Sequence, residues 1–337
     1  MKGILFTEPG KVVVTDSISM PKLNDGDVLT QSLFSGVTSG TELNFLQGGC
    51  YSPGWPVIPG YQNVGRIVEA PPNSQLTVGQ RVYSHYWYRP VQFEYRNKTY
   101  IQDAAAHLAF RGGPSVHPNL IPLPAGIPDV EASMLSVVCI GMHGARRAGA
   151  SIGKKVLVVG LGLVGQFAAQ AAKALGACCH AVDLLPNRLE LAAEYACEKV
   201  FEGSDDQAWN HIRKEGPYDI IIETSGVNAL LDKSLECLAG ERNEEREMQR
   251  QGVLYLMGGR NKVEYTNMLA HPKEAILMHS SHHTRKEVHE ALRLLDQGLL
   301  KISPFITHRF SPDDAPEVYK RMINRDPEMI GVVFDWN

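Results

Sequence analysis

Residues 156–166 of this 337-residue chain read VLVVGLGLVGQ. The run opens with apolar, largely β-branched residues, which favour a buried strand. Glycines at 160, 162 and 165 then form a G-x-G-x-x-G turn, and the Ala-rich residues 166–176 are compatible with a helix. Such glycines allow a tight bend, close approach of backbone N–H groups to a pyrophosphate, and close helix–strand packing. The stretch therefore predicts a dinucleotide site that includes Gly160, Gly162, Leu163, Val164 and Gly165.

A second apolar run, residues 178–182, ends in Asp183. An acid about twenty residues past the glycines is placed to bind a ribose 2′-OH. Residues 184–186 are Leu-Leu-Pro, so no basic side chain directly follows the acid to receive a 2′-phosphate, although Arg188 is close. We therefore expect NAD(H) rather than NADP(H). The expected cofactor-binding residues outside the glycine turn are Asp183, Arg188, Thr224 and Gly258.

The bulk composition narrows the function classes. An apolar content of 44%, a charged content of 21% and a net charge of −4 are ordinary for a globular protein. We find no basic tract, no apolar run of transmembrane length and no signal peptide, because residues 1–6 read as a strand. The six cysteines form no C-x-x-C pair, which fits reduced thiols in a cytoplasmic protein. We expect a small-molecule substrate, and neither nucleic acid nor membrane as a partner.

The pattern along the chain changes near residue 129. Residues 1–124 contain short alternating runs broken by Gly, Pro and Asn-Asp-Gly, which predicts a compact β-barrel-like domain. Beyond residue 129, helices (166–176, 187–197, 227–239) alternate with strands (156–159, 178–182, 219–224, 252–257), which predicts a doubly wound parallel sheet. The charged tract 240–251 is expected to be a solvated helix end or loop. A helix over 285–295 and a strand near 330–334 are expected to return to the first domain.

This layout resembles the medium-chain dehydrogenase/reductase superfamily over nearly the whole chain. The matching stretches, besides the glycine turn, are SGVTSGTE (35–42), IPGYQNVG (58–65), VGQRV (78–82) and FITHRF (305–310). The resemblance implies an α/β chain in which a Rossmann doubly wound parallel sheet, residues 129–274, is inserted in a GroES-like β-barrel catalytic domain, residues 1–128 and 275–337. The Ser-Gly-Thr-Glu form is similar to the subgroup of bacteriochlorophyllide dehydrogenase-like and sugar-pathway proteins.

The chain departs from the zinc alcohol dehydrogenases of that superfamily. Ser39 stands where they carry a metal-binding Cys, and Tyr61-Gln62 replaces their His-Glu after Gly60. Cys139 is near the third ligand position but would stand alone, and residues 84–110 lack the cysteines of a structural zinc lobe. Catalytic zinc needs three protein ligands. We therefore predict no metal.

A metal-free dehydrogenase needs side chains that handle a proton and a developing negative charge. Tyr61, at the former ligand position, is the first candidate, with a packing aromatic as the alternative. Thr41 matches the family's hydroxyl beside the substrate oxygen, or is a turn hydroxyl. His85, in an aromatic run over 83–89, is the second acid–base candidate. Glu42 and Gln62 are expected to orient Tyr61.

We therefore predict a zinc-independent NAD(H)-dependent oxidoreductase acting on a polar secondary alcohol or ketone, such as a sugar or cyclitol. One alternative is a zinc-free C=C reductase of the enoyl or quinone type. A second is a non-catalytic dinucleotide-binding protein. The family resemblance also implies a homodimer that pairs through the edge of the Rossmann sheet, expected at Val253–Met257.

Overall fold

The computed structural model describes residues 1–103, 105–244, 247–279 and 281–337. The chain forms two compact units, the first made of Met1–Ser136 and Ile306–Asn337, and the second of Val137–Phe305. The second unit is thus inserted between the two parts of the first. The sequence-based boundaries, after residues 128 and 274, lie earlier in the chain. The second unit extends past residue 274 because Ile276–His279 adds a strand to its sheet.

The second unit is built on a six-stranded parallel sheet of order β12-β11-β10-β13-β16-β17. The strands are β10 (Lys155–Val159), β11 (Cys178–Asp183), β12 (Lys199–Glu202), β13 (Ile220–Glu223), β16 (Val253–Leu256) and β17 (Ile276–His279). The predicted doubly wound parallel sheet is confirmed. The expected edge strand is wrong, because β16 lies between β13 and β17 and the edge is β17.

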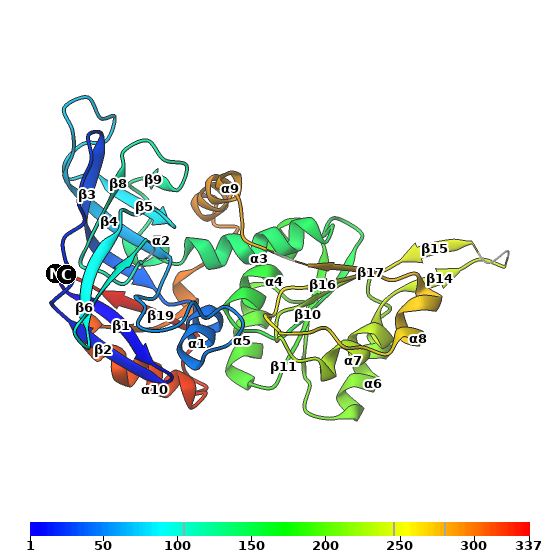
Figure 1. The fold of residues 1–337 in the computed structure, drawn as a ribbon. Helices are drawn as coiled ribbons and strands as arrows, with labels where there is room; N and C mark the ends of the chain where they lie inside the picture. The colour runs from blue at the N-terminus through cyan, green and yellow to red at the C-terminus, as the bar shows by residue number, and fades with distance from the viewer. Residues whose placement is uncertain (104, 245–246, 280) are drawn as a thin grey trace. The chain divides into compact units, whose positions relative to one another are not determined.

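Helices connect these strands (Figure 1). α3 (Leu135–Arg147) precedes the first strand. The connecting helices are α4 (Leu163–Ala174), α5 (Pro186–Tyr195), α6 (Asp206–Glu215), α7 (Ala229–Cys237) and α8 (Asn267–Ala270), and α9 (Arg285–Asp296) follows the last strand. The predicted helices over 166–176, 187–197, 227–239 and 285–295 correspond to α4, α5, α7 and α9. A capping box between Thr284 and Glu287 fixes the start of α9.

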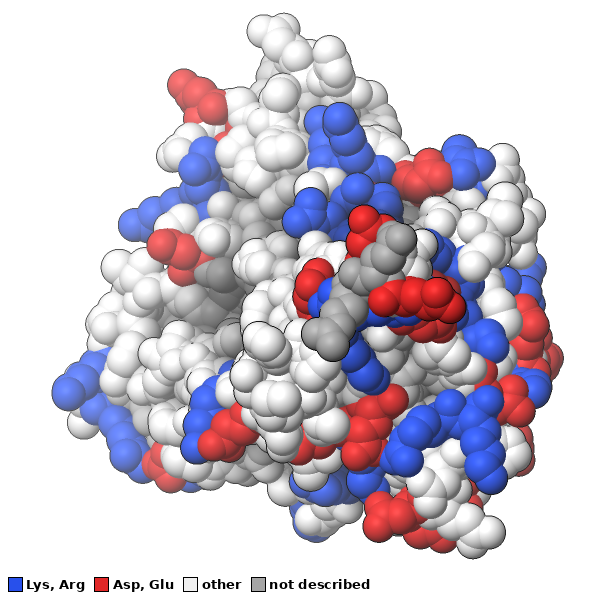
Figure 2. Space-filling view, turned by 90° about the vertical axis from the view of Figure 1, so that its right-hand side faces the viewer, with Lys and Arg blue, Asp and Glu red and all other residues white. Residues whose placement is uncertain are grey.

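The charged tract 240–251 is an antiparallel hairpin rather than a helix end. β14 (Gly240–Arg242) pairs with β15 (Met248–Gln251), while residues 245–246 lie outside the described residues. Figure 1 shows the two strands projecting beyond the parallel sheet. Salt bridges such as Arg242–Glu274 and Arg250–Glu241 mix both signs of charge here, as the surface in Figure 2 shows. The expectation of a helix end missed this pairing, because the hairpin has no apolar alternation to indicate it.

The first unit is mainly antiparallel β-structure. Its main sheet has the order β18-β19-β3-β4-β5-β9, with β8 also paired to β3, and two small sheets pair β1 with β2 and β6 with β7. The strands are β1 (Gly3–Glu8), β2 (Lys11–Thr15), β3 (Asp27–Gly36), β4 (Gln62–Glu69), β5 (Arg81–His85), β6 (Val91–Tyr95), β7 (Lys98–Gln102), β8 (Phe110–Pro114), β9 (Leu120–Pro122), β18 (Ile306–Phe310) and β19 (Gly331–Asp335). β19 pairs with β3, so the C-terminal strand closes the N-terminal sheet.

The described part of the first unit also contains the α-helices α1 (Ser39–Gln47), α2 (Asp129–Ala132) and α10 (Ala315–Ile323), the last preceded by a 3-10 turn over Pro312–Asp314. The face of α10 that carries Val318 and Tyr319 packs into one core with Phe6 and Phe334. Both chain ends therefore contribute to the packing beneath α1. Among the described residues, none of the helices combines the length and the apolar character that crossing a bilayer requires.

Candidate functional site

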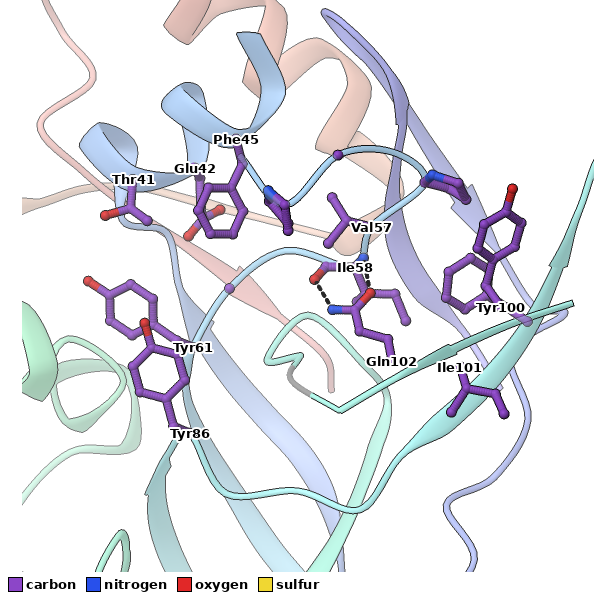
Figure 3. A pocket seen from close by; sticks show the side chains of 15 residues that line it. Thr41, Glu42, Phe45, Val57, Ile58, Tyr61, Tyr86, Tyr100, Ile101 and Gln102 are labelled. Atoms are coloured by element: carbon purple, nitrogen blue, oxygen red, sulfur yellow. Dashed lines mark hydrogen bonds between the residues drawn. The ribbon is translucent and has the colours of Figure 1, made fainter. Parts of the chain in front are cut away.

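A cavity of about 350 Å³ lies in the first unit. Its walls come from α1, from the segment 53–61 and from the β6–β7 pair. Figure 3 shows Thr41, Tyr61 and Tyr86 gathered at one end, and Tyr100 and Ile101 at the other. Two predicted catalytic residues, Tyr61 and Thr41, thus reach the same end of one cavity.

Tyr61 is a nearly buried phenol, with 9% of its surface exposed. Burial raises the pKa of its hydroxyl, and the neighbouring Tyr86 and Glu42 act in the same direction, whereas hydrogen bonding to Thr38 and Thr41 opposes the shift. The phenol is therefore protonated at neutral pH. In that state it can donate a hydrogen bond to an oxygen in the cavity.

Tyr61 also belongs to a three-ring cluster. Its ring stacks on Tyr86 with centroids 5.2 Å apart and meets the edge of His85 at 5.5 Å. Tyr86 has a φ of 44°, in the left-handed region that non-glycine residues rarely adopt. Sequence reasoning noted the aromatic run but did not single out Tyr86, because an unusual φ has no sequence signature in a Tyr. His85 contacts the other two rings, but it is not among the described residues that line the cavity.

Glu42 lies on the floor of the cavity and is only 1% exposed. Its Oε1 accepts hydrogen bonds from the backbone N–H of Thr38 at 2.7 Å and from the Thr38 hydroxyl at 2.9 Å. Its Oε2 accepts from the Tyr319 hydroxyl and from His107 Nε2, which is 3.1 Å away. Burial alone would raise the pKa of this carboxyl, but His107, Thr38 and Tyr319 together lower it. Glu42 is thus a fixed, ionised acceptor.

His107 connects Glu42 to the far side of the barrel. Its Nδ1 lies 2.7 Å from Ser35 Oγ, and that oxygen accepts a hydrogen bond from the Trp336 indole at 2.8 Å. His107 thereby bridges the Glu42 carboxylate and the Ser35 hydroxyl. The His107 ring can occupy this position only because residue 60 is Gly (φ +86°), since a Cβ there would lie 2.8 Å from the ring. Sequence reasoning missed His107 because its partners are far away along the chain.

Gln62 is fully buried beside Tyr61, at the start of β4. Its Oε1 accepts a hydrogen bond from the backbone N–H of Ser136 at 3.0 Å, and its backbone is the cross-strand partner of His85. Its Nε2 has no hydrogen-bond partner among the described residues. Gln62 therefore holds the backbone at Ser136, the last residue of this part of the first unit, and makes no described hydrogen bond to the Tyr61 hydroxyl.

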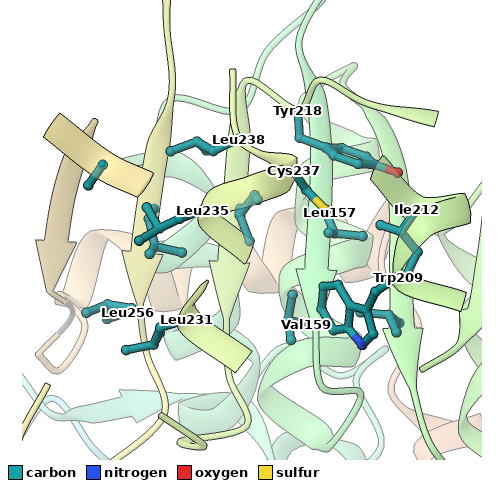
Figure 4. Packing of buried hydrophobic residues seen from close by; sticks show 14 residues of the cluster. Leu157, Val159, Trp209, Ile212, Tyr218, Leu231, Leu235, Cys237, Leu238 and Leu256 are labelled. Carbon is teal, nitrogen blue, oxygen red and sulfur yellow. The ribbon is translucent and has the colours of Figure 1, made fainter. Parts of the chain in front are cut away.

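In the second unit, the glycine turn follows β10. Gly160 has a φ of +89°, and a Cβ on Gly165 would stand 2.0 Å from the Gly160 carbonyl oxygen. The Thr224 hydroxyl donates to that carbonyl at 2.6 Å and so links the ends of β10 and β13. Below the turn, Val159 packs in a core with Trp209 and Leu231, shown in Figure 4. The glycines at 160 and 165 are thus required by the packing of the turn itself.

Gly162 is different, because a Cβ there would meet nothing within 4 Å. It is the N-cap of α4, and no side chain caps that helix. The first turn of α4 contains Leu163, Val164 and Gly165, whose N–H groups have no acceptor within the helix. Open space before an uncapped helix N-terminus fits a pyrophosphate.

Asp183 ends β11 beside this turn. Its Oδ2 accepts from the Leu161 N–H at 2.5 Å, and its Oδ1 accepts from the Leu184 and Leu185 N–H groups at 2.8 and 3.0 Å. Arg188 Nη1 is 3.9 Å from Asp183 Oδ2. Asp183 therefore holds the glycine turn in place, and its Oδ2, which accepts a single hydrogen bond from the described residues, retains capacity to accept a ribose hydroxyl.

Two further residues, Glu223 and Arg260, lie at or just after the carboxyl ends of these parallel strands and were not predicted. Glu223, fully buried at the end of β13, accepts hydrogen bonds from Ser225 and Gly226 N–H and pairs with Arg260. Gly258, one of the predicted cofactor-binding residues, donates from its N–H to the Glu223 carbonyl at 3.0 Å, and a Cβ on it would be 2.1 Å from Gly226 N. The signal in the sequence was a carboxylate closing the apolar run Ile220–Glu223. These contacts fix the loops after β13 and β16.

The structure also bears on metal binding. In the described ranges, no group of three or more His, Cys, Asp or Glu side chains is arranged to hold a metal ion. Cys139 is fully buried in α3, and burial raises the pKa of its thiol well above the ordinary value. The residues that replace the expected ligands, Ser39 and Tyr61, are a helix N1 serine and a stacked phenol.

Comparisons with known proteins agree with this architecture. Residues 164–297 match the family described as zinc-binding dehydrogenase. Sorbitol dehydrogenase 2 of Saccharomyces cerevisiae is 22% identical over 98% of this chain and 97% of its own length. The 2-desacetyl-2-hydroxyethyl bacteriochlorophyllide A dehydrogenase of Cereibacter sphaeroides is 25% identical over 92% of this chain and 91% of its own length. The family match does not reach residues 39–62, where the expected metal ligands are replaced.

A solved structure shows the same fold. L-idonate 5-dehydrogenase from Escherichia coli superposes with a TM-score of 0.81, at 21% identity, over 99% of this chain and 97% of that one. The predicted combination of a Rossmann sheet and a GroES-like β-domain is thereby confirmed.

Proposed function

Because this chain belongs to the medium-chain dehydrogenase/reductase superfamily, we propose that it is a zinc-independent, NAD(H)-dependent oxidoreductase interconverting a secondary alcohol and a ketone. The observation that carries the proposal is the protonated Tyr61 phenol beside Thr41 in the cavity of the first unit. The sequence-based expectation of a sugar, polyol or cyclitol substrate fits the relative named for sorbitol.

The second unit supplies the dinucleotide site in this proposal. The uncapped start of α4 at Gly162–Gly165 would hold the pyrophosphate, and Asp183 would accept from the adenosine ribose. A carboxylate in that position repels a 2′-phosphate, which favours NAD(H). Thr224 and Gly258 shape the loops that border the site. When bound, the nicotinamide ring supplies or accepts hydride.

The proposal of zinc independence rests on which metal-ligand atoms the cavity contains. Catalytic zinc takes three protein ligands of the N, S or O type. Tyr61 is engaged in ring stacking, and both oxygens of Glu42 already accept hydrogen bonds from Thr38, His107 and Tyr319. These residues do not fit a zinc site.

Tyr61 and Thr41 carry the proton chemistry in this proposal. As a ketone oxygen gains negative charge during reduction, the Tyr61 hydroxyl donates its proton to that oxygen, leaving a phenolate. Hydrogen bonding to Thr38 and Thr41 favours the ionised phenol, and the Thr41 hydroxyl can return a proton to it from water. Glu42 acts as a positioning residue through Thr38, whose hydroxyl bonds to it and whose side chain also hydrogen-bonds to Tyr61. Gln62 holds the backbone at Ser136, and His85 packs against the Tyr61 ring.

The test is steady-state turnover of a panel of alcohols and ketones, including sorbitol and fructose, with NADH and with NADPH. We expect ketone reduction with NADH, no stoichiometric zinc by elemental analysis, and activity that resists chelators. One zinc per chain with chelator-sensitive turnover would overturn the metal-free mechanism. Reduction of enones but not ketones, with NADPH preferred, would replace the proposal with a C=C reductase.

A further inference from the structure

We propose that the cavity of the first unit selects an uncharged substrate whose reacting carbonyl or alcohol is attached to an aromatic or branched apolar body. This inference rests on the proposed function for the identity of the reacting group. It narrows the polar alcohols of that proposal to amphipathic ones. One end of the cavity presents the Thr41 and Tyr61 hydroxyls, whereas the other is lined mainly by apolar and aromatic side chains.

The end of the cavity away from Tyr61 is apolar and aromatic. Phe93, on β6, is 2% exposed and stacks on Tyr100 of β7, with centroids 5.6 Å apart and planes 12° apart. Ile101 is 71% exposed and is among the residues that line the cavity. An apolar wall of this kind gains free energy from covering apolar substrate surface. The volume of about 350 Å³ lies near the lower end of the range for ligand pockets, roughly 300–1,000 Å³, so it suits a single ring with a short side chain.

Two polar side chains of the cavity, those of Gln102 and Glu42, are already engaged. Gln102 donates from Nε2 to the Ile58 carbonyl at 2.7 Å and accepts at Oε1 from the Ile58 N–H at 2.7 Å. Both carboxylate oxygens of Glu42 are held by Thr38, His107 and Tyr319. A chain of several hydroxyls along this wall would lose hydrogen bonds to water without replacing them. An unsubstituted polyol is therefore a poor match.

The cavity also lacks a positive charge for an anionic substrate. Of the lining residues that the structure describes, none is Lys or Arg, and Glu42 carries the single formal charge. A phosphate or carboxylate entering here would lose its hydration beside a carboxylate, with no cation in compensation. Phosphorylated sugars and sugar acids are therefore disfavoured.

The experiment compares matched ketones with the full-length protein and NADH. The pair 4-phenyl-2-butanone and 2-butanone differs only in the phenyl group, and fructose and fructose 6-phosphate represent neutral and charged polyhydroxy ketones. We expect kcat/KM for the phenyl ketone to exceed that for 2-butanone at least about tenfold, mainly through KM. Fructose should be weaker than the phenyl ketone, and fructose 6-phosphate weaker still.

Two variants locate the effect in the cavity. Ile101→Asp places a carboxylate among the apolar lining residues, and because Ile101 is exposed the substitution should leave folding intact. It should abolish most of the gain from the phenyl group, so that kcat/KM for the phenyl ketone falls towards the value for 2-butanone. Val116→Asp is the matched control, since Val116 is 86% exposed and is not among the described lining residues.

A second readout separates this inference from the proposed function. Saturation-transfer NMR measures binding of 4-phenyl-2-butanone to the protein without dinucleotide. Equal kcat/KM for the two butanones, or preferred turnover of fructose 6-phosphate, would overturn the inference while leaving the oxidoreductase in place. If no ketone is turned over but phenyl ketone binding is seen and is lost in Ile101→Asp, the inference stands and the proposed function fails.

Discussion

The ring of Tyr86 stacks on the ring of Tyr61, with centroids 5.2 Å apart and planes 21° apart. The backbones are joined as well, because the Tyr86 N–H donates to the Tyr61 carbonyl at 3.1 Å. Tyr86 achieves this in a left-handed conformation that costs of the order of 1–3 kcal/mol in a non-glycine residue. The surrounding structure holds Tyr86 in this unfavourable backbone conformation, and as a result the Tyr86 ring covers the Tyr61 ring. Such strain is concentrated at functional sites.

Replacing Tyr61 by Phe tests the proton donor. The ring and its stacking remain, so the free energy of unfolding should change by no more than about 1 kcal/mol. Loss of the hydroxyl should lower kcat for ketone reduction roughly 10²–10⁴-fold. Steady-state kinetics and urea unfolding measure the two quantities, with Tyr51→Phe as control because Tyr51 is 52% exposed. Wild-type kcat in Tyr61→Phe would assign the phenol to packing alone.

Replacing Tyr86 by Gly separates strain from function. Glycine adopts a positive φ at little cost, which offsets the loss of an aromatic pair worth about 0.5–1.5 kcal/mol. We expect the unfolding free energy to stay within about 1 kcal/mol of wild type, while kcat/KM falls because Tyr61 loses its covering ring. Tyr86→Ala keeps the strain and loses the ring, so it should be less stable than Tyr86→Gly. Equal unfolding free energies of Tyr86→Gly and Tyr86→Ala would show that the positive φ at residue 86 does not destabilise the wild-type protein.

Local patterns predicted the second unit well. The strand and helix around the glycine turn follow from apolar runs and from glycines whose neighbours leave no room for a Cβ, as at Gly165. The hairpin of Gly240–Arg242 with Met248–Gln251 was missed, since charged strands carry no alternation of apolar residues. The strand Ile276–His279 was not predicted, because a four-residue strand without flanking turn signals cannot be distinguished from a loop in the sequence.

The first unit shows where a sequence ceases to be informative. Tyr61, Thr41 and Glu42 were selected through the family resemblance, and the structure brings them to one cavity. Besides the nearby Thr38, the partners of Glu42 are His107 and Tyr319, 65 and 277 residues away. Nothing in the spacing of these residues predicts their contact, because it depends on how the C-terminal segment returns to the barrel.

Replacing Glu42 by Gln should change the pH dependence of stability. The folded-state pKa of Glu42 is lowered, so its contribution is fully present above about 4.5, the ordinary value, and is lost as the pH falls through the lower folded value. We expect Glu42→Gln to reduce the unfolding free energy by about 1–3 kcal/mol at pH 7, with a smaller difference at pH 3. Urea unfolding at both pH values measures this, and the exposed Glu69→Gln is the control. A gap that widens on acidification would contradict the ionised network.

Replacing Asp183 by Asn tests the choice of dinucleotide. The amide oxygen can still accept from the Leu161 N–H, but the negative charge that opposes a 2′-phosphate is gone. With Arg188 Nη1 only 3.9 Å from the same side chain, NADPH gains a nearby cation. The ratio of kcat/KM for NADH over NADPH should fall at least about tenfold, because like charges placed together cost several kcal/mol. Asp206→Asn, whose side chain is 90% exposed, should leave the ratio unchanged. An unchanged NADH/NADPH ratio in Asp183→Asn would show that residues other than Asp183 determine the choice of dinucleotide.

Alanine at two glycines of the same turn separates folding from cofactor binding. In Gly165→Ala the new methyl group would lie 2.0 Å from the Gly160 carbonyl oxygen, so we expect a loss of about 1–3 kcal/mol in stability. In Gly162→Ala the methyl group meets no protein atom within 4 Å, and the unfolding free energy should stay near wild type. That open space is where the pyrophosphate would lie, so Gly162→Ala should still weaken NADH binding, measured by fluorescence titration, at least about tenfold. A Gly162→Ala protein that binds NADH normally would show that the dinucleotide does not approach the start of α4.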